Sequence, residues 1–250
     1  MKKIISFVGV GPGDPDLLTI KAMKAIKSAE VIFWTNSLIP EKIIECSNEN
    51  TEKIKTGSLN LNEIIKIMIN KINEGKKVVR LHDGDPCLFG AIAEQIKLLQ
   101  KENIEVEVIP GISSFQVTAS YHQQELTIPN ITQTIILSRY GGRTGMPEKE
   151  SLEKLAQINA SLCLYLSARH VCEAQKKLLR YYRPDTKVIV GYRVSWDDGW
   201  TSLIELKDME KFSCEKKLIR TTIYIVSPAI DNFDKPSNLY DPQYKHLFRP

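Results

Sequence analysis

The chain has 250 residues, 42% hydrophobic and 26% charged, a composition typical of a globular protein with one large or two ordinary domains. Its net charge of +4, from 34 basic and 30 acidic residues, is too small to indicate a nucleic-acid-binding face, and its apolar runs are too short to cross a bilayer. Five scattered cysteines without CxxC spacing indicate neither a metal site nor a disulfide framework, and we expect a cytoplasmic protein.

The first predicted strand, residues 4–10, runs into the loop Gly11-Pro-Gly-Asp-Pro-Asp-Leu-Leu-Thr19. A helix follows, because small and apolar residues recur on one side of it at helical spacing. The glycines are spaced G-x-G-P-G and not G-x-G-x-x-G, and Pro12 and Pro15 remove amide donors that a pyrophosphate loop uses. We therefore exclude a dinucleotide site of the nicotinamide oxidoreductases and expect a rigid loop at the end of a strand.

Residues 31–34 and 77–81 are predicted strands, and residues 60–73 an amphipathic helix that Gly75 ends. The loop Gly84-Asp85-Pro86 then precedes a helix over residues 91–101, with Pro86 expected at the first helical position. Gly84 lets the backbone come close to a ligand, and Asp85 is an acceptor at a helix start. For this loop alone, a capped helix explains the residues as well as a ligand site does.

A third glycine turn, Pro110-Gly-Ile-Ser-Ser114, follows the predicted strand 104–109. The hydroxyl residues at its end can cap the next helix. Ligands of parallel α/β sheets bind outside the carboxyl ends of the strands. Three glycine turns after three strands of one half therefore indicate a single cleft.

The polar stretch 121–130 marks the expected domain boundary. Beyond it, strands are predicted at 133–138, 161–167 and 187–194, and residues 201–206 and 221–226 as a final, antiparallel pair. Helices are predicted at 148–158 and 168–182. This alternation predicts an α/β fold of two α/β domains with a cleft between them: residues 1–120, residues 121–235, and a tail over 236–250.

Together, Val8-Gly-Val-Gly-Pro-Gly-Asp-Pro-Asp-Leu-Leu-Thr19, Gly84-Asp85-Pro86 and Pro110-Gly-Ile-Ser-Ser114 resemble the tetrapyrrole (corrin/porphyrin) methylase superfamily. In the second half, Leu126–Thr134, Ile136–Arg139 and Gly142–Glu148 resemble the subgroup that acts at C11 of precorrin-4 or cobalt-precorrin-4. The stretches Tyr192–Trp196 and Arg220–Thr222 fit that subgroup as well. The resemblance extends to about residue 230, with a short match at His246–Arg249.

The resemblance implies an enzyme of cobalamin biosynthesis that methylates C11 of its tetrapyrrole substrate with S-adenosylmethionine as co-substrate. It also implies a homodimer, whereas the charge, the short apolar runs and the cysteine spacing are what predict no nucleic-acid, membrane or metal partner. The family's cofactor positions correspond to Pro12, Gly84, Asp85, Pro86, Leu88, Phe89, Ser113, Ser114, Leu166, Val194, Thr221 and Thr222. At Leu166, Val194 and Thr222 relatives carry alanine or methionine, so the match there is weaker than in the glycine loops.

Methyl transfer from a sulfonium needs neither a metal nor a covalent intermediate, and its main requirement is alignment of the two reactants. Corrin precursors carry many carboxylates, which favour arginine as binding partner. Arg80, Arg139 and Arg143 are therefore the predicted substrate anchors, with Tyr121 at the domain boundary as a further contact. Asp85 and His82 are the catalytic candidates, although Asp85 could instead bind the cofactor and His82 a propionate.

Three alternatives remain. A methylase of the same superfamily could act at another tetrapyrrole position or on uroporphyrinogen III, although the stretch 126–148 argues against this. A nucleic-acid methylase predicts a basic face with interleaved aromatic residues, which the nearly balanced charge does not favour. A non-catalytic corrinoid-binding protein would keep the same loops, and only turnover distinguishes it from an enzyme.

Overall fold

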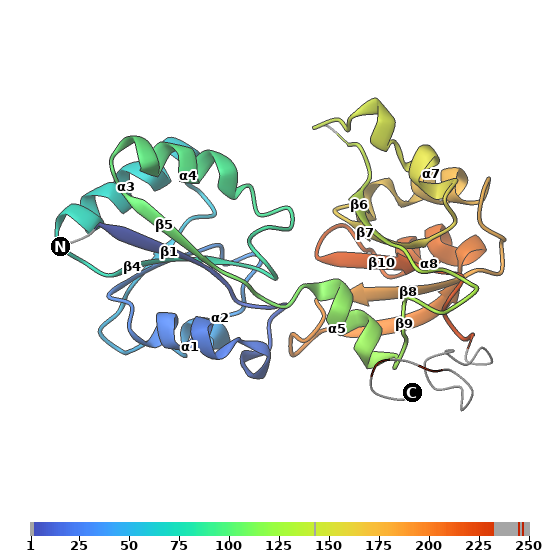
Figure 1. Ribbon diagram of the computed structural model, residues 1–250, viewed down its shortest axis with the longest axis horizontal. Helices are drawn as coiled ribbons and strands as arrows, with labels where there is room; N and C mark the ends of the chain where they lie inside the picture. Colours follow the sequence, from blue (N-terminus) through green and yellow to red (C-terminus); the bar gives the residue numbers. More distant parts are fainter. Residues whose placement is uncertain (1–2, 143, 233–244, 246, 248–250) are drawn as a thin grey trace. The chain divides into compact units, whose positions relative to one another are not determined.

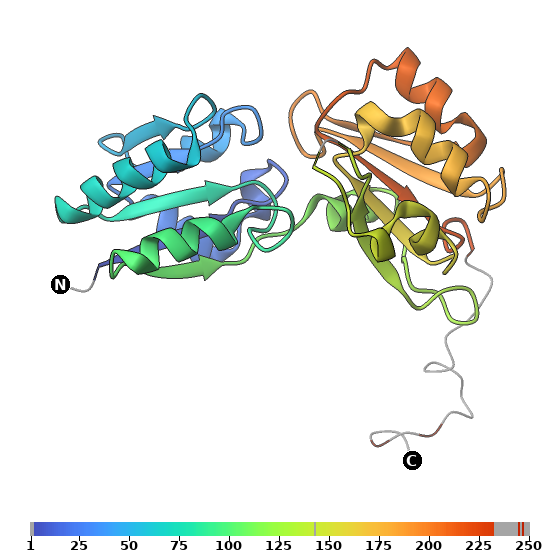
Figure 2. The ribbon, with the colours of Figure 1, turned by 90° about the horizontal axis from the view of Figure 1, so that it is seen from above.

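The computed structural model describes residues 3–142, 144–232, 245 and 247. The chain forms two compact units (Figures 1 and 2). The first contains Met1–Val117 and Arg193–Asp198, and the second contains Thr118–Tyr192 and Gly199–Pro250. The division therefore falls within a helix, three residues before the expected boundary, and a short segment of the second half belongs to the first unit.

The first unit is an α/β layer structure whose strands all run parallel, in the order β3-β2-β4-β1-β5. Its elements, in chain order, are β1 (Ile4–Gly9), the 3₁₀ turn η1 (Pro15–Leu17), α1 (Ile20–Lys27), β2 (Val31–Trp34), α2 (Glu41–Ile44), β3 (Glu52–Lys55), α3 (Leu61–Asn73), β4 (Val78–His82), α4 (Ile92–Lys101), β5 (Glu105–Ile109) and the start of α5 (Ser114–Tyr121).

Helices cover both faces of this sheet, α1 and α2 on one side and α3 and α4 on the other (Figure 1). Side chains alternate along each strand, so Val8 packs toward α1 and α2 while Phe7 packs toward α3 and α4. The inner strand β2 (Val-Ile-Phe-Trp) is consequently apolar on both faces, as buried parallel strands are. Helix α3 begins with a capping box, in which Asn60 and Glu63 each bond the other's backbone amide at 3.1 and 2.7 Å.

The second unit holds a mixed sheet in the order β6-β7-β10-β8-β9. Strands β6 and β7 are parallel, and the other neighbours are antiparallel. Its elements are β6 (Ile135–Arg139), η2 (Glu148–Glu150), α6 (Leu152–Ala156), β7 (Ser161–Tyr165), η3 (Ala168–His170), α7 (Val171–Leu178), β8 (Lys187–Tyr192), β9 (Trp200–Glu205), η4 (Leu206–Asp208), α8 (Met209–Glu215) and β10 (Thr222–Val226).

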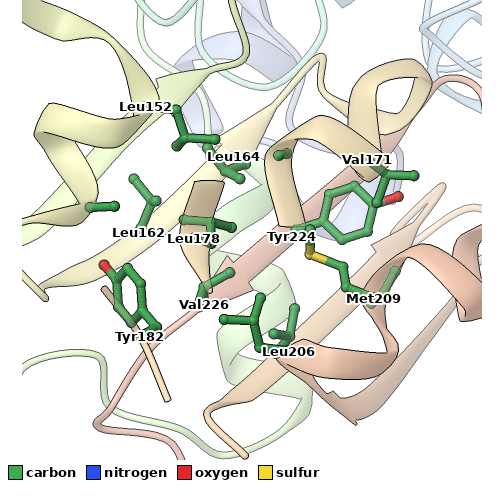
Figure 3. Packing of buried hydrophobic residues seen from close by; sticks show 14 of the residues in the cluster. Leu152, Leu162, Leu164, Val171, Leu178, Tyr182, Leu206, Met209, Tyr224 and Val226 are labelled. Carbon is green, nitrogen blue, oxygen red and sulfur yellow. The ribbon is translucent and has the colours of Figure 1, made fainter. Parts of the chain in front are cut away.

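Apolar residues of β7, β8 and β10 pack against α6, α7 and α8 to form the core of the second unit (Figure 3). Two buried tyrosines bring their hydroxyl groups to partners inside it: Tyr182 donates to the Ala160 carbonyl at 2.7 Å, and the Tyr224 hydroxyl lies 2.9 Å from that of Ser213. Cys163 is fully buried in β7. No helix among the described residues is long and apolar enough to cross a membrane.

The α/β class and the alternation of elements are confirmed, but several local expectations were wrong. Helices α2 and α8 and strand β3 were missed, because they are short and β3 is largely exposed. Strands β9 and β10 do not pair with each other: α8 lies between them in the chain, and β8 lies between them in the sheet. Helix α4 begins at Ile92, one residue after its expected start, but Pro86 does not occupy its first position and lies instead in a turn over residues 86–89.

Candidate functional site

The three glycine turns follow β1, β4 and β5, which are neighbours in the parallel sheet, so all three lie at one edge of the first unit. The first two turns continue the pairing of their strands. The amide of Val10 donates to the His82 carbonyl at 2.9 Å, and Gly11 and Gly84 exchange backbone hydrogen bonds of 3.2 and 2.8 Å. The predicted single site is thus supported within the first unit by direct contact between the loops.

Gly9 and Gly111 are required here because the backbones come too close for a side chain. A Cβ on Gly9 would lie 2.5 Å from the amide nitrogen of Gly111, and one on Gly111 would lie 2.8 Å from the Gly9 carbonyl carbon and still closer to the Gly84 oxygen. Real Cβ atoms essentially never make such contacts. The glycines therefore pack the three loops together, which explains their positions without a dinucleotide.

The Asp85 carboxylate connects two of these loops. Its Oδ1 accepts from the amide of Cys87 at 2.8 Å, within its own loop, and its Oδ2 accepts from the amide of Gly111 at 3.0 Å. Each oxygen thus accepts a backbone hydrogen bond, and the side chain holds the turn after β4 against the turn after β5. This geometry favours a binding or positioning role for Asp85 over that of a proton acceptor.

The turn after Pro86 is tight, because a Cβ on Gly90 would overlap the Pro86 carbonyl oxygen. Phe89 and Ala91 have positive φ angles of 59° and 49°, so the chain reverses before α4 can begin. This is why Pro86 does not start the helix. Leu88 is half-buried and Phe89 is exposed at 44%, which leaves the Phe89 ring accessible at the same edge as the glycine loops.

The remaining predicted cofactor residues of the first unit lie close to these loops in the chain or in space. Ser113 is buried, and its amide donates to Gln116 Oε1 at 3.0 Å where α5 begins at Ser114. Val194 is buried within Arg193–Asp198, the segment that belongs to this unit. Pro12 contacts the same segment, since its carbonyl accepts from Trp196 Nε1 at 3.0 Å.

In the second unit, Leu166 and the pair Thr221-Thr222 lie together at one end of the strands of the sheet. Leu166 directly follows β7, and β10 begins at Thr222 and runs antiparallel to β7, so the two positions lie at the same end of adjacent strands. Leu166 is 70% exposed, whereas Thr222 is buried and pairs with Tyr192 at the end of β8. An apolar side chain this exposed at a strand end is suited to contact a ligand.

Backbone strain points to the same stretches. Positive φ angles outside glycine are uncommon, and at functional sites they are maintained by surrounding contacts. Asn103, Gln123, Asn159 and Lys217 follow helices, where such angles end the helix, and Asn130 and Asp231 lie in turns. The other six in the described part of the chain lie at, or within two residues of, predicted cofactor positions: Phe89, Ala91, Leu166, Arg193, Ser195 and Thr221.

The sequence profile of the tetrapyrrole (corrin/porphyrin) methylases matches residues 5–205, most of the chain. The chain belongs to this family. A cobalt-precorrin-4 C(11)-methyltransferase from Methanocaldococcus jannaschii is 43% identical over 251 aligned residues, covering 99% of this chain and 96% of the relative. The resemblance seen in the sequence is therefore confirmed over nearly the whole chain.

Solved structures of methylases agree. The X-ray structure of a cobalt-precorrin-4 methyltransferase, a cobalamin biosynthetic enzyme, superposes with a TM-score of 0.88 at 35% identity, covering 91% of this chain and 96% of that one. A uroporphyrin-III C-methyltransferase from Thermus thermophilus, solved with S-adenosyl homocysteine, has a TM-score of 0.75 at 25% identity and covers 90% of this chain and 98% of its own.

Within this methylase, Arg80 is a poor match to a surface anchor, since it is only 7% exposed. Its Nη1 donates to Thr56 Oγ1 at 2.7 Å, and that hydroxyl lies 3.0 Å from Thr35 Oγ1. Burial lowers the pKa of Arg80 to about 10, which leaves it charged at neutral pH, and Asp83 partly offsets this effect. The Nε atom has no hydrogen-bond partner within the described part of the chain.

His82 lies on the same face of β4 as Arg80 and is equally buried. Burial, with the Arg80 charge as a smaller cause, lowers the pKa of His82 to about 3. Its ring packs against Phe7 at 5.3 Å, and among the residues described its Nε2 has no hydrogen-bond partner. A histidine with this pKa is a weak general base at neutral pH, so its environment favours a hydrogen-bonding role over proton transfer.

The substrate candidates of the second unit differ in their environments. Arg139 uses Nη1 and Nη2 to bind Thr144 Oγ1 at 3.0 Å and the Gly145 carbonyl at 2.6 Å, so it orders the glycine-rich loop that follows β6. Tyr121, at the end of α5, is 54% exposed. Arg143 lies outside the described residues.

Two residues that contact the loops of the candidate site, Ser195 and Lys42, were not predicted from the sequence. Ser195 accepts from the amide of Asp14 at 3.0 Å, and Lys42 donates to the Ser195 carbonyl at 3.1 Å. These pairs are 181 and 153 residues apart in the chain, and no local spacing pattern could have joined them. The described residues hold no group of three or more His, Cys, Asp or Glu that could bind a metal ion.

Proposed function

We propose that this protein transfers the methyl group of S-adenosylmethionine to C11 of the precorrin-4 macrocycle in cobalamin biosynthesis. The observation that carries the proposal is the 43% identity to a cobalt-precorrin-4 C(11)-methyltransferase over 99% of this chain. A solved methyltransferase of the same description has a similar fold. Since both names include cobalt, cobalt-precorrin-4 is the first substrate to test, with metal-free precorrin-4 beside it.

Residues of each unit are the candidates for binding the proposed co-substrate. In the first unit they are those of the packed glycine loops with Val194, and in the second they are Leu166 with Thr221 and Thr222. The packing of the glycine loops and the strained backbone at Phe89, Leu166 and Thr221 support this proposal. Loops held rigidly before binding lose little freedom when a ligand orders them, which improves affinity.

Bound S-adenosylmethionine would supply an electrophilic methyl group on a sulfonium sulfur. The electron pair for the new carbon–carbon bond comes from the macrocycle, while the sulfur keeps the pair of the bond that breaks and becomes the thioether of S-adenosylhomocysteine. The protein's contribution is to hold the acceptor carbon in line with the methyl and the departing sulfur. Asp85 serves this task by joining the turns after β4 and β5.

Substrate carboxylates are proposed to bind Arg139 and Arg143, with Tyr121 as an exposed contact. Arg139 already has two loop contacts, so it would both order its loop and present the rest of its guanidinium. Arg80 and His82 are both buried in β4, so their proposed role is to support the turn that follows this strand. A homodimer remains a prediction of the family resemblance, which light scattering tests, and a cytoplasmic location remains a prediction from the sequence.

The test is transfer of labelled methyl from S-adenosylmethionine to cobalt-precorrin-4 and, in parallel, to precorrin-4 and uroporphyrinogen III. We expect a product one methyl heavier from a precorrin-4 substrate, with the label at C11 by NMR. Transfer to uroporphyrinogen III alone, or label at another carbon, would replace the proposed substrate. Binding of S-adenosylhomocysteine without transfer to any macrocycle would favour a non-catalytic binding protein.

A further inference from the structure

The segment Arg193–Asp198, which we call the clasp, lies between β8 and β9 in the chain but packs as part of the first unit. It makes two hydrogen bonds to the loop after β1. Trp196 Nε1 donates to the Pro12 carbonyl at 3.0 Å, and the Asp14 amide donates to Ser195 Oγ at 3.0 Å. The two bonds flank Gly13 on either side.

The clasp is itself held in one conformation. Lys42 Nζ donates to the Ser195 carbonyl at 3.1 Å and to Asp197 Oδ1 at 2.9 Å. The Arg193 guanidinium stacks on the Trp196 ring at 4.0 Å and pairs with Asp198 at 2.9 Å. Arg193 and Ser195 keep positive φ angles of 43° and 67°, which are unfavourable for both residue types unless such contacts maintain them.

The backbone of Gly13 packs directly against the Trp196 indole of the clasp. A Cβ at this position would lie 2.6 Å from Trp196 Cδ1 and 2.8 Å from its Nε1, so no side chain fits between the loop and the ring. The backbone of Gly13 also has a φ of 147°, which favours glycine. The loop after β1 therefore approaches Trp196 too closely for a residue that carries a Cβ at position 13.

We propose that Trp196 is a positioning residue for the cofactor, acting through Pro12. The inference rests on the proposed function, since Pro12 and Val194 are the predicted cofactor contacts. Proline has no amide hydrogen, so its carbonyl is the backbone group by which a hydrogen bond can orient its peptide plane. The indole N–H supplies that bond, and the same clasp holds Val194 buried two residues away.

The test is Trp196→Phe, which keeps an aromatic ring for Arg193 but removes the N–H donor. Loss of one neutral hydrogen bond predicts S-adenosylhomocysteine binding about five-fold weaker by calorimetry. The KM for S-adenosylmethionine should rise by a similar factor, while kcat and the KM for the macrocycle stay unchanged. Ser195→Gly, which removes the second bond and suits the positive φ, should also weaken binding and serves if Trp196→Phe does not fold.

Trp34→Phe is the matched control, because the buried Trp34 Nε1 has no hydrogen-bond partner in the part of the chain that is described. It should leave cofactor affinity unchanged. If the wild-type protein binds S-adenosylhomocysteine and Trp196→Phe binds it equally well, the inference is overturned and the proposed function stands. Equal losses in both variants would overturn it as well, since they would indicate a general effect on folding. If the wild-type protein does not bind S-adenosylhomocysteine, the proposed function fails and the inference fails with it.

Discussion

Replacement of Asp85 by asparagine tests whether this carboxylate acts as a base or as a connector of loops. The carboxylate accepts one amide on each oxygen, from Cys87 at 2.8 Å and from Gly111 at 3.0 Å. Asparagine offers one acceptor oxygen and one NH₂ donor in the same space. One of the two backbone amides must therefore lose its partner and face another donor.

The magnitude follows from these two contacts. A hydrogen bond to a charged group contributes about 1.5–3 kcal/mol, and Asp85 is partly exposed, so the lower half of that range applies. We expect the first unit to lose about 1.5–2 kcal/mol of unfolding free energy. Because the affected loops are predicted to hold the cofactor, S-adenosylhomocysteine binding should weaken by about ten-fold.

The assays are urea denaturation and calorimetric titration with S-adenosylhomocysteine, alongside turnover. Asp16→Asn is the control, since it removes an exposed carboxylate from the loop after β1 at the same edge of the sheet. Stability and cofactor affinity like the wild type, together with loss of turnover, would refute the connector role and make Asp85 the base. Similar effects of Asp16→Asn would show that net charge, and not the two hydrogen bonds, governs affinity.

Three further predictions concern the same loops and the substrate. Gly111→Ala should lower the free energy of unfolding by about 1–3 kcal/mol and reduce cofactor affinity, because the new Cβ would overlap Gly84. An unchanged melting temperature and an unchanged affinity would contradict this packing. The pKa of His82 is near 3 in the folded protein against 6.5 in the unfolded chain, so the stability present above pH 6.5 is lost as the pH falls toward 3. In urea titrations between pH 4 and 6, His82→Gln should reduce the slope of unfolding free energy against pH by up to about 1.4 kcal/mol per pH unit. An identical slope in both proteins would refute that assignment. Arg143→Ala should raise the KM of the macrocycle more than that of S-adenosylmethionine; equal increases would remove Arg143 from substrate binding.

The sequence by itself was sufficient for the class of fold and for the site loops of the first unit. Buried parallel strands have continuous apolar runs, and each of β1, β4 and β5 is followed by glycine and proline in a recognisable order. These patterns are local, so they can be recognised before the chain folds. The Asn60 and Glu63 capping box is local for the same reason, and the start of α3 was predicted within one residue.

Short or exposed elements could not be predicted from such local patterns. Strand β3 has the sequence Glu-Lys-Ile-Lys with largely exposed side chains, and it exists because its backbone pairs with β2. The start of α4 was predicted within one residue, but Pro86 was wrongly expected at its first position. A proline after an aspartate is also suited to a turn, and the close approach of Gly90 to the Pro86 carbonyl shows that the chain turns before the helix begins. The order of β8, β9 and β10 depends on pairing between distant strands, which no local pattern encodes.

Only the tertiary structure showed the contacts and burial of the candidate site residues. It showed that both carboxylate oxygens of Asp85 accept hydrogen bonds from backbone amides and that Arg80 and His82 are buried. It also showed that Trp196 donates to the Pro12 carbonyl, 184 residues away in the chain. Periodicity and motif spacing describe what neighbours along the chain do. Desolvation, hydrogen-bond partners and close backbone approaches depend on residues far away in the sequence, and they exist only once the chain has folded.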